Sequence, residues 1–215
     1  MVTGARSSLP SLPKNRVLLV EGRNDKHVVE HLYRKRFQAE PSFDIMDKDG
    51  FSPLCDAIIP ELKVPGRQVV GIVVDADDRP ESRWSAVTDR LRKGCPGLEI
   101  GIPAPCGTIL GADPRIGVWL WPDNESRGEI ENFVATMIPS GDPVWPFSKH
   151  YIDSIPVNQR LFSEGKTMRA KVHAWLAARA EPRRMGTAIR AGDLVVSGSP
   201  ATRFASWLEN LFNQA

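Results

Sequence analysis

Cysteines and long apolar runs are scarce in this chain, and each scarcity excludes a class of protein. Only three cysteines, Cys55, Cys95 and Cys106, occur among 215 residues, without a CxxC pair or a Cys/His ligand spacing. This argues against a disulfide framework and against a structural zinc site. No stretch is long and apolar enough to span a bilayer, and the first residues lack the apolar run of a signal peptide. We therefore expect a protein of the reducing cytoplasm that has no membrane partner.

The rest of the composition is that of an ordinary globular protein. Hydrophobic residues make up 41% and charged residues 25% of the chain, so a sizeable core can form. The formal net charge is only +2, but most of the basic residues are arginine, whose guanidinium binds phosphate through two hydrogen bonds. The charges are therefore compatible with a nucleic-acid partner, and an ordinary solvated surface explains them equally well.

Short apolar runs alternate with helical patterns as far as Asn124. The expected strands are RVLLVEG, FDIM, RQVVGIVVDADD, LEIGI and RIGVWLWPDN. Between them, helical spacing predicts helices over residues 24–37, with Asn24 as the N-cap, over 51–62 and over 82–94. This alternation predicts an α/β fold with a mostly parallel sheet flanked by helices.

The later residues are predicted to be helical. Helices are expected over 128–138, 167–180 and 201–212, with Pro- and Gly-rich loops such as 140–148 between them. We therefore divide the chain into a flexible N-terminus (1–14), an α/β domain (15–140) and a helical extension packed on it (141–215). The side chains expected to be buried in this extension are Ala174, Trp175, Leu176, Trp207, Leu208 and Leu211.

Acidic side chains follow two of the expected strands. Glu21 closes the first strand, and Asp75 and Asp77, two apart on one side of extended backbone, close the third. If these strands are parallel neighbours, the three side chains converge at their carboxyl ends, where open sheets bind ligands. An all-oxygen cage suits Mg²⁺ or Mn²⁺. The alternative is that these acids are merely exposed or cap the next helix, and the pairing of the two motifs favours the metal site.

The segments VLLVEGRND and GIVVDADD resemble the TOPRIM domain, which topoisomerases, bacterial primases, small rRNA-maturing nucleases and OLD-family nucleases share. The family pattern is a glutamate after an apolar strand and a DxD after a later one, and Glu21, Asp75 and Asp77 match it. Further segments between residues 15 and 213 resemble a family of prokaryotic TOPRIM-like proteins. The resemblance implies a TOPRIM-like, Rossmann-like fold that binds Mg²⁺ or Mn²⁺.

The resemblance to OLD-type nucleases implies roles for further residues. Asp25 matches the second acid of their ExxxD motif, although the helix dipole alone favours an acid in a first helical turn. Glu131 matches another metal-ligating acid, with Glu129 as the second choice and a solvated helix face as the alternative. Lys171, or else Lys166, matches the lysine that these nucleases place by the scissile phosphate, whereas most lysines are solvated surface groups.

Together these residues predict a metal-dependent nuclease. Two cations would activate a water and stabilise the leaving oxygen of a DNA or RNA phosphodiester, with Lys171 as the catalytic lysine. Arg23 and Lys166 would bind its phosphates. The predicted metal ligands are Glu21, Asp25, Asp75, Asp77 and Glu131.

The alternative function is a non-catalytic or partner-activated regulatory subunit that binds nucleic acid. OLD-type nucleases carry an ATPase domain, whereas this sequence contains no GxxxxGK[ST] motif. The resemblance therefore implies a separate ATPase partner, as in two-gene phage-defence systems. A topoisomerase is disfavoured, because it needs a catalytic tyrosine in another domain and only Tyr33 and Tyr151 occur.

Overall fold

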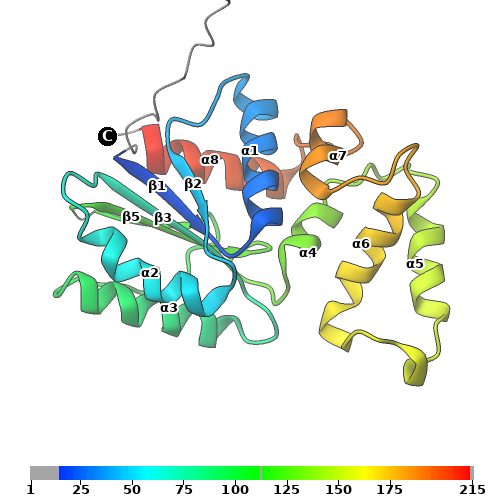
Figure 1. Cartoon of the computed structure of the whole chain (residues 1–215), viewed down its shortest axis with the longest axis horizontal. Helices are drawn as coiled ribbons and strands as arrows, with labels where there is room; N and C mark the ends of the chain where they lie inside the picture. The colour runs from blue at the N-terminus through cyan, green and yellow to red at the C-terminus, as the bar shows by residue number, and fades with distance from the viewer. Residues whose placement is uncertain (1–14, 112, 214–215) are drawn as a thin grey trace, which may run out of the picture.

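A single mixed sheet forms one half of the molecule in the computed structural model, which describes residues 15–111 and 113–213 (Figure 1). The flexible N-terminus expected over residues 1–14 lies outside the described residues. Within them, the strands form one five-stranded sheet in the order β2-β1-β3-β5-β4. The strands are β1 (Arg16–Val20), β2 (Asp44–Asp47), β3 (Val69–Asp75), β4 (Thr108–Leu110) and β5 (Arg115–Trp121).

All neighbouring strands are parallel except β4, which runs antiparallel to β5 at one edge. The predicted α/β class with a mostly parallel sheet is therefore confirmed. So is the adjacency of β1 and β3, on which the expected meeting of their acids depends.

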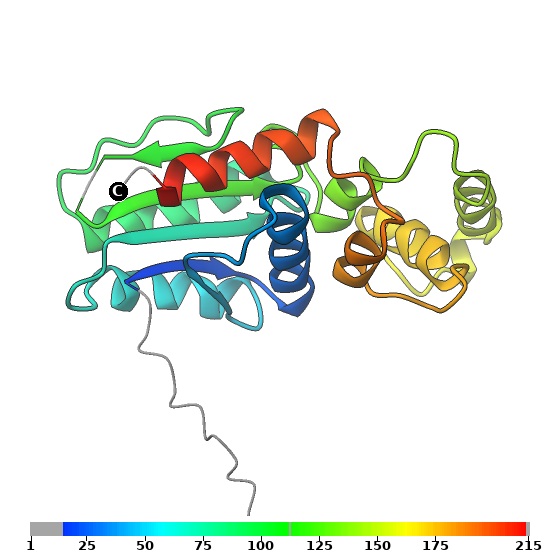
Figure 2. The ribbon, with the colours of Figure 1, turned by 90° about the horizontal axis from the view of Figure 1, so that it is seen from above.

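Helices cover both faces of the sheet (Figures 1 and 2). The helices α2 (Phe51–Leu62) and α3 (Pro80–Gly94) lie on one face, and α1 (Arg23–Phe37) and α8 (Ser199–Asn213) lie on the other. Alternate residues of β1 enter the two cores: Val17 and Leu19 pack on the first face, Leu18 and Val20 on the second. Burial on both faces explains why these strands are continuously apolar.

A second group of helices stands beyond the carboxyl ends of the strands (Figure 2). It comprises α4 (Ile130–Ala135), α5 (Trp145–Ser154), α6 (Thr167–Ala177), α7 (Met185–Ala191) and the short 3-10 helices η1 (Val157–Gln159) and η2 (Glu164–Lys166). Apolar side chains of α6 and α7 belong to the same buried cluster as those of α1 and α8. The residues after 140 therefore share a core with the sheet.

Five of the six side chains that were expected to be buried in the later helices are buried. Trp175, Leu176, Trp207, Leu208 and Leu211 are buried, whereas Ala174 is half-buried. In the described part of the chain, no helix combines the length and the apolar character that crossing a bilayer requires.

Two local predictions in the first half of the chain are wrong. The segment 98–102 is not a strand, and the edge strand is β4 instead. Leu98 and Ile100 pack on the core beside α2 and α3, and the carbonyl of Gly101 accepts a hydrogen bond of 2.9 Å from Trp84 Nε1. The first helix begins at Arg23, so its N-cap is Gly22 and not Asn24.

Two α-helices were not predicted. The helix α5 begins at Trp145, inside the segment 140–148 that was expected to be a loop, and α7 has no counterpart among the expected elements. Pro146 lies in the first turn of α5, where the missing amide proton of a proline is not needed. Prolines that suggest a loop therefore mark a helix start here.

Two glycines allow α8 to lie close to the sheet. Gly71 and Gly117 are neighbours on β3 and β5, and a β-carbon on either would meet Leu211 of α8. We expect Gly117→Val to lower the free energy of unfolding by about 1–3 kcal/mol, because overpacking forces the helix away from the sheet. Urea unfolding measures this change. Gly101→Val is the control, since a β-carbon there meets nothing within 4 Å; equal losses in both variants would contradict the close-packing argument.

Candidate metal centre

The first two acids of the site meet because β1 and β3 are adjacent and parallel. Glu21 directly follows β1, and Asp75 is the last residue of β3. The backbone N–H of Asp75 donates a hydrogen bond of 2.8 Å to Glu21 Oε1. The carboxylate of Glu21 therefore bridges the two strand ends and holds the start of the DxD segment in place.

The third acid of the motif, Asp77, faces the site because the backbone changes direction after β3. Asp77 has a left-handed backbone with φ of 49°, so it no longer continues the strand. It forms an isolated antiparallel bridge with Gly128, in which both N–H···O distances are 2.8 Å. The expectation that Asp77 lies on extended backbone with Asp75 is therefore wrong. The two carboxylates still converge, because the bridge fixes the turn.

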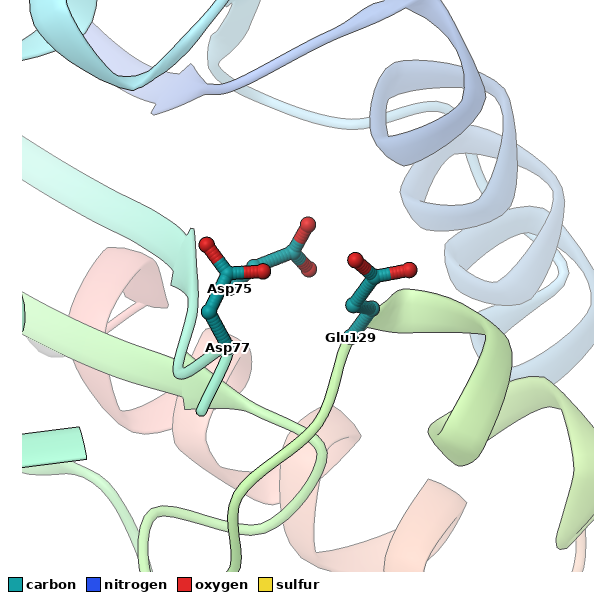
Figure 3. Close-up of side chains that lie close together, drawn as sticks. All are labelled: Asp75, Asp77 and Glu129. Atoms are coloured by element: carbon teal, nitrogen blue, oxygen red, sulfur yellow. The ribbon is translucent and has the colours of Figure 1, made fainter. Parts of the chain in front are cut away.

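The same bridge brings in a residue from the start of α4. Glu129 follows Gly128, and the next backbone N–H, that of Ile130, donates a hydrogen bond of 2.9 Å to Asp75 Oδ1. Asp75, Asp77 and Glu129 each offer an oxygen, and these oxygens lie within 4.8 Å of one another. Figure 3 shows the three carboxylates converging from the end of β3 and the start of α4. Three such oxygens can hold a metal ion.

This arrangement changes the order of preference between the two glutamates of GEIENF. Glu129, the second choice from sequence, belongs to the oxygen cluster, and Glu131, the first choice, does not. Glu131 is nonetheless buried and close enough to Asp25 and Asp75 for its charge to raise the pKa of both. A solvated helix face, the alternative for these residues, is excluded for both glutamates, which are buried.

The innermost acid is Asp25 of α1. It is buried, and its Oδ1 accepts a hydrogen bond of 3.0 Å from Trp121 Nε1. Burial, together with the nearby charges of Glu21 and Glu131, raises the pKa of Asp25 to about 7. Burial, followed by the charges of Asp25 and Glu21, raises the pKa of Asp75 well above its ordinary value. Burial also raises the pKa of Glu21, so these three acids bind protons more readily than free carboxylates do.

Basic side chains neutralise the outer acids. Lys166 of η2 contacts both Glu129 and Asp77, with a distance of 3.3 Å from its Nζ to Asp77 Oδ1. Arg83 of α3 pairs with the other carboxylate oxygen of Asp77, Oδ2. Burial acts to raise the pKa of Asp77, but the hydrogen bond and charge of Arg83 and the charge of Lys166 bring it below its ordinary value.

Two residues of α6 reach the buried glutamates. Arg169 lies 3.1 Å from Glu129 Oε2 and 3.2 Å from Glu131 Oε1, and His173 Nε2 lies 3.7 Å from the latter atom. Burial acts to raise the pKa of Glu131, but the nearby His173 and the charge of Arg169 lower it overall. The site therefore combines a network of ion pairs around Asp77, Glu129 and Glu131 with three carboxylates whose pKa is raised, those of Glu21, Asp25 and Asp75.

The structure separates the two candidate lysines. Lys171, predicted from the family resemblance to be catalytic, pairs with Asp153 of α5 at 2.8 Å. The lysine at the carboxylates is Lys166, which was expected only to bind phosphate. Arg23 is exposed at the first residue of α1, two residues after Glu21 in the chain.

Sequence reasoning missed Arg83, Arg169 and His173. Arg83 follows the DxD segment by six residues, a spacing that could have suggested a side chain returning from the next helix. Arg169 and His173 gave no signal, because only the packing of α6 against α4 brings them to the site.

The donor set fits a hard divalent cation. Every candidate ligand is a carboxylate oxygen, which Mg²⁺ and Mn²⁺ prefer. Buried Glu131 Oε2 has no hydrogen-bond partner among the described residues, although a buried acceptor normally has one. The raised pKa values of Asp25 and Asp75 reflect the burial and like-charge repulsion that a bound cation would relieve.

Comparison with known proteins gives a family for this chain. No curated protein and no solved structure matches it. A family model with the description "protein of unknown function (DUF3226)" matches residues 15–213. The match covers the whole sheet, the carboxylates and the helices that contact them. The chain therefore belongs to the DUF3226 family.

Proposed function

We propose that this protein is a metal-dependent phosphodiesterase of the nuclease type, which hydrolyses DNA or RNA with Mg²⁺ or Mn²⁺. The observation that carries the proposal is the convergence of Asp75, Asp77 and Glu129, whose oxygens lie within 4.8 Å of one another at the end of β3. The resemblance of VLLVEGRND and GIVVDADD to TOPRIM motifs supports the same chemistry.

We assign the candidate metal ligands to two groups. Asp75, Asp77 and Glu129 form the outer group, beside the pocket that a substrate would enter. Asp25 and Glu131 form a deeper group, and the charges of both raise the pKa of Asp75, so the two groups are electrostatically coupled. Divalent cations bound there supply Lewis-acid stabilisation of the phosphate and a water of lowered pKa.

Other residues of this chain bind and orient the substrate. Glu21 holds the backbone of Asp75 and so fixes the geometry of the outer group. Lys166 lies at the outer carboxylates, and we assign to it the role beside the scissile phosphate that sequence reasoning gave to Lys171. Arg23, exposed at the start of α1, remains a predicted phosphate ligand.

A partner-activated subunit is the second candidate function, and one observation favours it. Arg83, Lys166 and Arg169 already pair with the carboxylates that would bind the cation. These pairs compete with metal binding, so a partner that draws α6 or η2 away would increase the affinity for the metal. The resemblance to OLD-type nucleases favours a separate ATPase in that role, within a phage-defence system.

Glu129→Gln tests the proposed function directly. We expect it to lower the rate of oligonucleotide hydrolysis in Mg²⁺ or Mn²⁺ by roughly 100-fold, as the loss of one charged stabilising group commonly does. The assay is the release of a fluorescent label from DNA and RNA, single- and double-stranded. Glu125→Gln, at an exposed glutamate in the loop before α4, is the matched control and should retain full activity. If the wild type binds Mn²⁺ but cuts no nucleic acid, the regulatory subunit replaces the nuclease.

A further inference from the structure

A pocket of about 740 Å³ lies beside the outer carboxylates. One wall consists of Asp77, Asp78, residues 127–129 before α4, and Asn132 in its first turn. The other wall belongs to the α5–α6 hairpin and consists of Asp153, Arg160 and residues 163–168, with Lys171 further along α6. In Figure 1, α5 and α6 stand side by side beyond the sheet. The pocket therefore lies between the metal ligands and the helical hairpin.

The turn at η2 closes one side of this pocket. A β-carbon on Gly165 would lie 2.9 Å from Asp78 Oδ1, so the turn passes directly over the loop after β3. The next residue, Lys166, contacts Asp77 and Glu129. The pocket between the hairpin and the start of α4 therefore gives a phosphodiester a route to these carboxylates.

The size of the pocket limits what can enter. Small-molecule sites have volumes of about 300–1,000 Å³, and this pocket lies within that range. A nucleotide or two fits such a space. A double helix is too wide to enter it, since its major groove alone is about 12 Å wide. Enzymes that act within such pockets bind unpaired or flipped-out nucleotides.

The charges of the pocket point to an anionic ligand that binds together with a metal. Four cationic side chains line it, and they are Arg127, Arg160, Lys166 and Lys171. Five carboxylates line it as well, and they are Asp77, Asp78, Glu129, Asp153 and Glu164. The ionised lining thus carries one net negative charge, and a single divalent cation on the outer carboxylates would reverse that sign.

Two of the basic side chains are held in place by α5. Lys171 pairs with Asp153 at 2.8 Å. Arg160 donates hydrogen bonds of 3.0 Å and 3.1 Å to the carbonyl oxygens of Ile155 and Asp153. These contacts hold cationic groups on the hairpin wall, opposite the metal ligands, where a phosphate next to the reacting one would lie.

We propose that this pocket binds unpaired nucleotides of a single strand, and that it binds them only together with a divalent cation. The inference rests on the proposed function, because it names the substrate class of the same site. It also assigns a function to the α5–α6 hairpin, whose cationic wall would orient the strand across the outer carboxylates.

Fluorescence anisotropy tests the inference with the full chain. The probe is a labelled oligothymidylate with phosphorothioate linkages, which resist hydrolysis, either alone or paired with its complement. In Mg²⁺ the single strand should bind at least tenfold more tightly than the duplex, a difference of about 1.4 kcal/mol. In EDTA its affinity should fall at least about tenfold, because the pocket then repels phosphate.

A pair of charge reversals locates the binding site. Arg127→Glu, in the pocket, should weaken single-strand binding roughly tenfold. Arg36→Glu, at the exposed end of α1, adds the same charge outside the pocket and should leave the affinity within about twofold. Equal effects of the two reversals would place the strand elsewhere and overturn the proposal. Three other results would also overturn the proposal: duplex binding as tight as single-strand binding, an affinity that is the same in Mg²⁺ and in EDTA, or no binding of either probe.

A separate measurement keeps this inference distinct from the proposed function. Hydrolysis of bis(4-nitrophenyl) phosphate in Mn²⁺ reports the chemistry without requiring a nucleic acid. If Glu129→Gln abolishes that hydrolysis and the wild type does not prefer single strands, the inference fails and the nuclease chemistry stands. If single strands are preferred but neither the ester nor any oligonucleotide is hydrolysed, the pocket stands and the proposed hydrolysis fails.

Discussion

Asp75→Asn should raise the thermal unfolding midpoint of the metal-free protein and abolish the increase that Mg²⁺ or Mn²⁺ produces in the wild type. Asp75 is buried among carboxylates, and its pKa is raised by burial and by the charges of Asp25 and Glu21. An asparagine removes the charge and one ligand, while its Oδ1 can still accept the hydrogen bond from Ile130 N–H. The opposite signs of the two effects distinguish this result from a general loss of stability.

The size of the metal effect follows from mass action. A cation at 100 times its dissociation constant stabilises the folded state by about 2.7 kcal/mol. For a chain of this length the midpoint then rises by roughly 5–10 °C. Because Asp75 must lose its proton to bind the cation, the increase should be larger at pH 8 than at pH 6. Phosphodiester hydrolysis should fall by roughly 1,000-fold in the same variant, since the outer and deeper groups both use this carboxylate.

Differential scanning calorimetry with and without metal measures both effects of Asp75→Asn. Asp89→Asn is the control, because Asp89 is exposed on α3 and pairs only with Arg92 of the same helix among the described residues. It should change neither the metal-free midpoint nor the response to metal. A wild-type midpoint that does not move at millimolar Mg²⁺ or Mn²⁺ would mean that the isolated chain does not bind the cation, and the partner-activated function would then lead.

Asp25→Asn should remove much of the loss of stability that the metal-free wild type shows as the pH rises from 4 to 8. The pKa of Asp25 is about 7 in the folded protein, against an ordinary value of 3.8. Between these values the folded state holds a proton that the unfolded chain has lost, so the free energy of unfolding falls as the pH rises. A difference of about 3 pH units corresponds to roughly 4 kcal/mol. The stabilisation is complete below pH 4 and is lost as the pH rises through 7.

The Asp25→Asn variant is therefore expected to be more stable than the wild type at pH 8 and equal to it near pH 4. Asparagine keeps the acceptor for Trp121 Nε1, so packing at this buried position changes little. Urea unfolding at a series of pH values in EDTA measures the difference, with Glu30→Gln on the same helix as the control. Unchanged pH dependence in the Asp25 variant would show that Asp25 ionises in the folded protein without cost. Saturating Mg²⁺ should also flatten the wild-type curve, because the cation offsets the repulsion.

The local pattern of apolar residues was enough to predict β1 and β3, the strands that lead to Glu21 and to the DxD motif. The runs before Glu21 and Asp75 are continuously apolar, because β1 and β3 are buried on both faces, and that signal is strong in a short window. Their adjacency followed from the chemistry, since the acids could meet only if the strands were neighbours. The same reasoning failed for segment 98–102, because Leu98 and Ile100 pack against the core from a loop, and apolar contact of this kind requires no strand pairing.

The α/β class, the two motifs and the meeting of Glu21, Asp75 and Asp77 at one end of the sheet could be predicted from residue types and their spacing. The choice between Glu129 and Glu131 depends on the folded chain, because the bridge from Asp77 to Gly128 sets which glutamate joins the oxygen cluster. The tertiary structure likewise placed the cationic side chains of α3, η2 and α6 at the site. Periodicity reports which face of an element is buried, whereas convergence of segments far apart in the chain depends on long-range packing that no short window of sequence contains.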